Sequence, residues 1–340
     1  MDDKGTVLVT GGSGYIGGWC VIGLLQQGYR VRTTVRSLSR EAEVRAALGK
    51  VVDPGDALSF HAAELTADAG WDEAAAGCDY LLHVASPLGI AEPKDPDVLI
   101  VPARDGARRA IGAAIKAKVR RVVLTSSVAA TSKSDPGDSL SDETVWTDLN
   151  DPTLSAYARS KTIAERAAWD LIGASGVATT LATVNPALVL GPVLSGDYSG
   201  SVQVVERLVA GRMPGLPRLG FNVVDVRDVA DLHIRAMTMP EAAGQRFIAA
   251  GVYAWMADLA VLLKAELGAD GAKVPTRKVP DFVLRLAGII DKEIASVAPG
   301  LGRKHDFTSA KAQSLLGWRP RPMRETVLDC ARSLIATGAV

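Results

Sequence analysis

Near its N-terminus the chain reads Thr6-Val7-Leu8-Val9-Thr10-Gly11-Gly12-Ser13-Gly14-Tyr15-Ile16-Gly17. The first five residues are apolar or β-branched, which is typical of a buried strand, and the glycine-rich turn opens a segment of helical period. Glycine allows a tight turn and lets backbone N–H groups approach a phosphate, while Gly17 permits close packing of helix on strand. We therefore predict a phosphate-binding turn built from Gly11, Gly14, Tyr15, Ile16 and Gly17, although a purely structural turn would read similarly.

Further apolar, β-branched runs recur along the chain between segments of helical period. They span residues 30–35, 58–61, 80–84, 122–125 and 178–184. Helical segments include 15–27, 97–118 and 157–172, in which apolar residues recur every three or four positions. This alternation predicts an α/β fold with a Rossmann-type, doubly wound parallel sheet.

The pattern becomes less regular after Pro186, where glycines and prolines crowd residues 191–200 and 211–220. A strand at 222–226, a helix at 228–239 and a strand at 246–249 are expected to return to the main sheet. We therefore expect a discontinuous nucleotide-binding domain of residues 1–186 plus 223–250. A smaller, mostly helical C-terminal substrate lobe would comprise 187–222 plus 251–340, with a last helix at about 323–335.

Charge and cysteine content narrow the range of partners. The 340 residues contain 38 Lys and Arg against 38 Asp and Glu, so no net charge attracts nucleic acid. The three cysteines are widely separated, which matches neither a disulfide framework nor a zinc site, and the four histidines show no metal spacing. No apolar run approaches the roughly 18 residues of a membrane span. We expect a cytoplasmic protein without a metal, a membrane or a nucleic-acid partner.

The end of the second predicted strand bears on the choice of cofactor. It reads Thr33-Thr34-Val35-Arg36, where an NAD-selective site usually offers Asp or Glu to the adenosine ribose. Arg36 can instead pair with the 2′-phosphate of NADP, and Arg32 or Arg40 can add positive potential. The residues favour NADP(H), and the alternative is that these arginines are solvated surface charges.

A pair of serines, a tyrosine and a lysine have side chains suited to carbonyl chemistry. Ser126 and Ser127 end the strand predicted at 122–125, and Tyr157 and Lys161 share one helical face. Because ligands bind outside the carboxyl ends of parallel strands, these groups are expected to face the cofactor crevice. Lys161 is expected to lower the pKa of Tyr157, which would donate a proton while Ser127 holds the substrate oxygen. Each residue alone also fits a structural role.

With these motifs in place, the chain resembles the extended short-chain dehydrogenases/reductases over nearly its whole length. Within them it is similar to the branch of dihydroflavonol reductases, cinnamoyl-CoA reductases and microbial NADPH-dependent aldehyde or ketone reductases. The resemblance rests on the glycine-rich turn, residues 31–36, His83-Val84-Ala85-Ser86-Pro87, residues 121–127, Tyr157 to Lys161, and Leu316-Gly317-Trp318-Arg319-Pro320.

The resemblance implies roles for individual residues. It implies a catalytic set of Ser127, Tyr157 and Lys161, with Ser126 as the alternative serine and with Tyr157 and Lys161 also contacting the cofactor. Arg36 would recognise the 2′-phosphate. Further residues implied at the cofactor are Val84, Ala85 and Ser86 along it, Pro186 near the nicotinamide, and Glu64-Leu65 where many relatives place Asp-Leu beside adenine.

Departures from the family patterns narrow the range of expected substrates. Ser132 stands where dihydroflavonol reductases usually present an asparagine, and the region around Tyr157 lacks the tryptophan- and cysteine-containing signature of cinnamoyl-CoA reductases. We therefore expect a small, largely apolar aldehyde or ketone, or the corresponding alcohol in the reverse direction, acted on by a monomer or homodimer. Trp146, Phe221, Tyr253 and Trp255 are candidates for the substrate pocket or for core filling.

Two other functions stay open. A nucleotide-sugar epimerase or dehydratase with tightly bound NAD shares the turn and the Tyr-Lys pair, but such enzymes commonly place Asn where Leu188 precedes Gly191-Pro192. A non-catalytic NADP-sensing protein can dispense with Tyr157 and Lys161, and both are present here.

Overall fold

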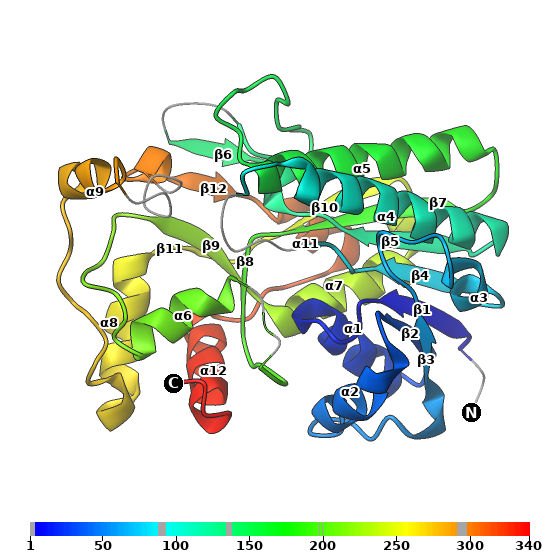
Figure 1. Cartoon of the computed structure of the whole chain (residues 1–340), viewed down its shortest axis with the longest axis horizontal. Helices are drawn as coiled ribbons and strands as arrows, with labels where there is room; N and C mark the ends of the chain where they lie inside the picture. Colours follow the sequence, from blue (N-terminus) through cyan, green and yellow to red (C-terminus); the bar gives the residue numbers. More distant parts are fainter. Residues whose placement is uncertain (1–3, 88–92, 134–137, 197, 199, 291–297) are drawn as a thin grey trace.

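The computed structural model describes residues 4–87, 93–133, 138–196, 198, 200–290 and 298–340. Seven parallel strands form the main sheet, in the order β10-β7-β5-β4-β1-β2-β3 (Figure 1). The strands are β1 Thr6–Thr10, β2 Arg30–Val35, β3 Leu58–Ala62, β4 Tyr80–His83, β5 Arg121–Thr125, β7 Thr180–Pro186 and β10 Gln245–Ala249. The predicted Rossmann-type fold class is confirmed. Because the order reverses between β1 and β4, the ligand crevice of such a sheet lies outside their carboxyl ends.

Helices cover both faces of this sheet. One face carries α1 Tyr15–Gln26, α2 Glu41–Leu48 and α7 Val226–Thr238, and the other carries α3 Trp71–Ala75, α4 Asp97–Lys116 and α5 Ala156–Ser175 (Figure 1). β1 shows why its run of apolar residues is continuous: Val7 and Val9 pack in the core on the first face, and Leu8 packs in the core on the second.

A smaller lobe lies beside the main sheet (Figure 1). Its three-stranded sheet has the order β11-β9-β8, with β8 Leu188–Leu190, β9 Gly220–Asp225 and β11 Tyr253–Trp255. Its helices are α6 Val202–Val209, α8 Met256–Glu266, α9 Asp281–Ala287 and α12 Met323–Ala336, whereas α11 Ala310–Leu316 packs against β10 and α7. A parallel pair of short strands, β6 Ser139–Ser141 and β12 His305–Phe307, joins segments far apart in the sequence. No helix in the described part of the chain has the length and apolarity that crossing a membrane requires.

Only part of the segment expected to return to the main sheet does so. α7 packs on that sheet and β10 becomes its edge strand beside β7, as expected. β9 does not join it but pairs with β8 and β11. The physical reason is that β10 already occupies the edge of β7, while Asn222 anchors β9 to the lobe through bonds to Gly251 O (2.9 Å) and Asp306 Oδ1 (2.8 Å).

Candidate active site

The glycine-rich turn leaves no room for a side chain at positions 12 and 17. A Cβ added to Gly12 would lie 2.1 Å from Thr33 Oγ1, and one added to Gly17 would lie 2.2 Å from the Gly11 carbonyl oxygen. Gly11 has a φ of +71°, and Gly14 N donates to its carbonyl at 2.9 Å. The turn opens α1 without a side-chain cap, so it forms a backbone-lined cradle of the kind that suits a pyrophosphate.

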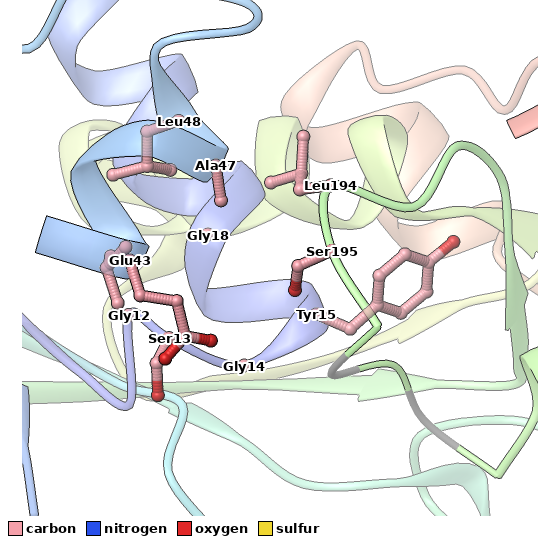
Figure 2. Close-up of a pocket in the computed structure, with 11 residues that line it drawn as sticks. Gly12, Ser13, Gly14, Tyr15, Gly18, Glu43, Ala47, Leu48, Leu194 and Ser195 are labelled. Atoms are coloured by element: carbon pink, nitrogen blue, oxygen red, sulfur yellow. The ribbon is translucent and has the colours of Figure 1, made fainter. Parts of the chain in front are cut away.

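Residues 191–195 close over this turn, a contact that the sequence did not predict. The Tyr15 hydroxyl donates to Gly191 O at 2.8 Å, and Trp19 Nε1 donates to Pro192 O at 3.0 Å. Figure 2 shows the Tyr15 ring beside the segment that carries Leu194 and Ser195, across a pocket from α2. Tyr15 therefore anchors the covering segment with its side chain, while Ile16 is half-buried against the core.

The arginines around the turn have different partners. Arg36 follows the carboxyl end of β2 and is exposed. Arg40 Nη1 donates to Ser13 Oγ of the turn at 3.3 Å. Arg32 Nη1 instead donates to the carbonyls of Glu73, Ala74 and Ala76, at 3.3, 2.8 and 2.7 Å. Arg40 thus lies beside the turn, where it also forms an ion pair with Glu43 at 3.1 Å, whereas Arg32 is bound to the end of α3.

The chain after β4 lies against the same turn. Thr10 Oγ1 accepts hydrogen bonds from Val84 N and Ala85 N at 3.0 Å each, so its own proton goes to His83 Nδ1 at 2.9 Å. A Cβ added to Gly11 would lie 3.0 Å from Ala85 Cβ. Val84 and Ala85 therefore lie against the glycine-rich turn.

Three further predicted cofactor residues have the following places. Glu64 is exposed just beyond β3, and Leu65 packs on α4 so closely that a Cβ on Gly106 would meet it at 2.5 Å. Pro186 is buried at the carboxyl end of β7, beside Ala249 of β10. Both strand ends lie at the edge of the sheet that carries the cradle.

Ser127, Tyr157 and Lys161 come together at the end of β5. Ser127 follows that strand, and its side chain is hydrogen-bonded to the Tyr157 phenol. Tyr157 lies in the first turn of α5, after the capping residue Ser155. Lys161 Nζ lies 5.9 Å from the centroid of the Tyr157 ring, and its residue is only 7 % exposed.

The electrostatics of this set differ from expectation. Burial raises the pKa of Tyr157, and the hydrogen bond with Ser127 opposes that rise. Burial also lowers the pKa of Lys161 to about 8, against the opposing charge of Glu165. The expected lowering of the Tyr157 pKa by Lys161 is therefore wrong, because removing the phenol from water disfavours its anion more than its neighbours stabilise it.

Sequence reasoning missed the groups behind this set. Glu165, one turn after Lys161 on α5, accepts hydrogen bonds from Ser126, Asn185 and Arg246, and all four side chains are buried. The four-residue spacing from Lys161 was the one signal in the sequence, because it places Glu165 on the same helical face. Its partners come from β7, from β10 and from the residue directly after β5.

The four candidate pocket aromatics have different surroundings. Trp146 stacks with Arg246, whose guanidinium lies 3.7 Å from the ring centroid, and Tyr253 donates to Arg303 O at 3.3 Å. Trp255 lines a cavity of about 600 Å³ together with Phe282. Phe221 is half-buried on β9. Among the described residues, no three His, Cys, Asp or Glu side chains gather as a metal site would require.

A strand-turn-helix phosphate cradle, followed by Ser-Tyr-Lys at the end of β5, defines a recognisable architecture. Residues 7–250 match the model of the NAD dependent epimerase/dehydratase family. The chain belongs to this family, within the extended short-chain dehydrogenases/reductases.

Several characterised members of the family are similar to this chain. Cinnamoyl-CoA reductase 2 of Arabidopsis thaliana is 36 % identical over 251 residues, which cover 73 % of each protein. Anthocyanidin reductase of Vitis vinifera is 33 % identical over 296 residues, covering 82 % of this chain and 84 % of that one. The crystal structure of yeast methylglyoxal/isovaleraldehyde reductase Gre2, complexed with NADPH, superposes with a TM-score of 0.83 at 26 % identity, covering 98 % of this chain and 100 % of that one.

Proposed function

We propose that this family member is an NADPH-dependent reductase that transfers hydride to the carbonyl carbon of a small, largely apolar aldehyde or ketone. The reaction is reversible, so the enzyme also oxidises the corresponding alcohol. The observation that carries the proposal is the convergence of the Ser127 hydroxyl, the Tyr157 phenol and the Lys161 ammonium at the crevice edge of the main sheet. Relatives named as reductases, and Gre2 with its NADPH, support it.

The residues around the crevice fit NADPH. The turn from Gly11 to Gly17 offers backbone N–H groups and the positive end of α1 to the pyrophosphate. Arg36, with Arg40 adding positive potential, would pair with the 2′-phosphate, and Lys161 would hold the nicotinamide ribose. When bound, NADPH supplies the hydride.

The protein supplies the proton and holds the oxygen. Ser127 and Tyr157 both donate hydrogen bonds to the substrate oxygen, and those bonds strengthen as the oxygen gains negative charge. Tyr157 then passes its proton to that oxygen, which completes the alcohol. The raised pKa of Tyr157 keeps the phenol protonated at neutral pH, the state required for reduction. Lys161 stabilises the phenolate left behind.

The substrate class rests on the surroundings of Ser132. Its hydroxyl donates to Val128 O at 3.0 Å, so it is engaged where a flavonoid would need a polar partner. We further propose that residues 187–222 plus 251–340, together with β9, form the substrate lobe of a cytoplasmic monomer or homodimer, and that residues 1–186 with α7 and β10 hold the cofactor.

An assay of NADPH oxidation over a substrate panel tests the proposal. The panel contains aromatic and aliphatic aldehydes, diketones, ketoesters, cinnamoyl-CoA and an anthocyanidin, each measured with NADPH and with NADH. We expect the highest kcat/KM for a small aldehyde or ketone with NADPH. Binding of NADPH without turnover of any carbonyl would favour a cofactor-sensing protein, and conversion of a nucleotide sugar without net oxidation of cofactor would favour an epimerase.

A further inference from the structure

A fully buried carboxylate lies directly behind the proposed catalytic set. Glu165 has no exposed surface. Its Oε2 accepts hydrogen bonds from Ser126 Oγ at 2.5 Å and from Asn185 Nδ2 at 2.9 Å. Its Oε1 accepts one from Arg246 Nε at 2.6 Å. Residues of β7 and β10, and the residue directly after β5, therefore meet at one side chain of α5.

These bonds restrain the peptide that carries the proposed substrate-binding serine. Ser126 is held by its own hydroxyl on Glu165, and its N–H donates to Val184 O at 2.8 Å. Ser127 is held through Asn185, whose Nδ2 also donates to the Ser127 carbonyl at 3.1 Å. One carboxylate thus fixes both residues of the pair, immediately beyond the last residue of β5. The direction of the Ser127 hydroxyl depends on that backbone.

The charge of Glu165 is balanced by a guanidinium that is itself locked in place. Arg246 donates a second hydrogen bond, from Nη2, to Glu165 Oε2 at 3.3 Å. It also donates to the carbonyls of Glu143, Val145 and Ala130, and it stacks on Trp146. A buried ion pair is costly to desolvate, and well-packed apolar residues often give equal or greater stability. Stability alone is therefore a weak reason for this arrangement, whereas control of geometry and charge beside Lys161 is a direct one.

We propose that Glu165 is a positioning residue for the reduction: through Ser126 and Asn185 it holds the Ser127 hydroxyl in place, and it sets a negative charge one helical turn from the Lys161 ammonium. This inference rests on the reductase function proposed above.

The charged and titratable groups around Lys161 give the proposal a pH signature. Tyr157 and Glu165 face it from α5, His83 faces it from β4, and Arg246 of β10 lies on the far side of Glu165. α4 contributes alanines to the small cavity that Lys161 borders. Burial, followed by the charge of Lys161, lowers the pKa of His83 to about 3, so this imidazole stays neutral. The negative charge of Glu165 therefore acts to raise the pKa of Lys161, against the larger lowering that burial causes.

The variant Glu165→Gln removes this charge while keeping the shape of the side chain. Since Glu165 favours the ammonium, its loss lowers the pKa of Lys161 further, and the basic limb of the pH profile of kcat moves to lower pH by about one unit. Displacement of Ser127 lowers kcat by about 100-fold. NADPH affinity, measured by fluorescence titration, stays within about twofold because the cradle is untouched. Asp170→Asn, an exposed carboxylate on the same helix, is the matched control and retains the wild-type values.

Thermal melting and near-UV circular dichroism show whether Glu165→Gln folds. Two further variants test the proposal if it does not. Ser126→Ala and Asn185→Ala each cut one link to the serine pair and leave the ion pair with Arg246 intact. We expect kcat to fall about 5- to 10-fold in each, from the loss of about 1 kcal/mol of hydrogen bonding, without movement of the basic limb.

The outcomes separate the inference from the proposed function. A folded Glu165→Gln enzyme with wild-type kcat, or with reduced kcat and an unmoved basic limb, would overturn the positioning role. So would wild-type kcat in both Ser126→Ala and Asn185→Ala if Glu165→Gln does not fold. An inactive wild-type protein over the whole carbonyl panel would instead reject the reductase function itself.

Discussion

Two influences compete at the phenol of Tyr157. Burial raises its pKa, and its hydrogen bond with Ser127 lowers it. The outcome is a neutral phenol beside a lysine whose own pKa falls to about 8. In the proposed reduction this phenol holds the proton that the substrate oxygen takes up, and the phenolate that results lies beside a positive charge.

We predict that Tyr157→Phe lowers kcat by about 10²- to 10⁴-fold, the usual contribution of a positioned acid. The NADPH dissociation constant, measured by fluorescence titration, should change little because the cofactor is held by the turn and the arginines. Tyr80→Phe is the control and should keep wild-type kcat, because Tyr80 is the first residue of β4 and lies at the end of the strand away from the crevice. Retention of most activity in the Tyr157 variant would reject the phenol as the acid.

We also predict that the selectivity for NADPH over NADH depends on Arg36. Arg36→Asp should weaken NADPH binding about 10- to 100-fold, because a charge-assisted contact worth about 1.5–3 kcal/mol is lost and the new carboxylate repels the 2′-phosphate. NADH binding should change far less. Titration of both cofactors checks this, with Arg30→Asp at the other end of β2 as the control. Equal weakening for the two cofactors would refute the role.

At the scale of elements, the junction of β1 and α1 depends on atoms that touch across the turn. A Cβ on Gly17 would collide with the Gly11 carbonyl. Any residue other than glycine at position 17 would therefore push α1 away from β1. The cradle and the packing of α1 on the sheet are consequently one structural feature. Damage to either should appear in both stability and cofactor affinity.

We predict that Gly17→Ala costs about 1–3 kcal/mol of unfolding free energy through overpacking and raises the NADPH dissociation constant at least about tenfold. Gly112→Ala in α4 is the matched control, because its added Cβ meets no atom within 4 Å. That variant should be about 0.5–1 kcal/mol more stable than wild type. Urea unfolding with and without NADPH measures both effects, and tolerance of Gly17→Ala would show that the turn can open without loss.

At the scale of the whole molecule, His233 of α7 connects one of the two helical layers to β5 of the main sheet. This fully buried side chain of α7 donates from Nδ1 to Val229 O at 2.7 Å, so its Nε2 accepts from Thr125 Oγ1 of β5 at 2.7 Å. Burial lowers the pKa of His233 to about 4. The folded protein therefore keeps this imidazole neutral at pH values where an unfolded chain would protonate it.

The sign of the pH effect follows from linkage. The unfolded state takes up the proton near pH 6.5, so the stabilisation is complete above that pH and is lost as the pH falls through about 4. Between pH 7 and pH 5 we predict that the unfolding free energy of wild type falls by about 2 kcal/mol more than that of His233→Gln. Urea unfolding of both proteins at the two pH values checks this, and parallel falls would contradict it.

Much of the fold was readable because its signals are local. Residues 6–17 encode strand, turn and helix through neighbours in sequence, and the six sheet strands predicted before Pro186 all lie within two residues of observed ones. The spacing of Tyr157 and Lys161 fixes their shared helical face whatever surrounds them. Sequence alone thus determined the Rossmann-type sheet, the cradle and the composition of the proposed catalytic set.

Tertiary structure decided what depends on segments distant in the chain. In the tertiary structure β9 pairs within the smaller sheet, and Arg32 binds the end of α3 while Arg40 contacts the turn. The partners of Glu165 come from β7, from β10 and from the residue after β5. Tertiary structure also reversed the expected shift at Tyr157. The physical reason is common to all: the choice of strand edge, hydrogen-bond partner and degree of desolvation is set by what packs nearby, and periodicity in one segment carries no information about its neighbours in space.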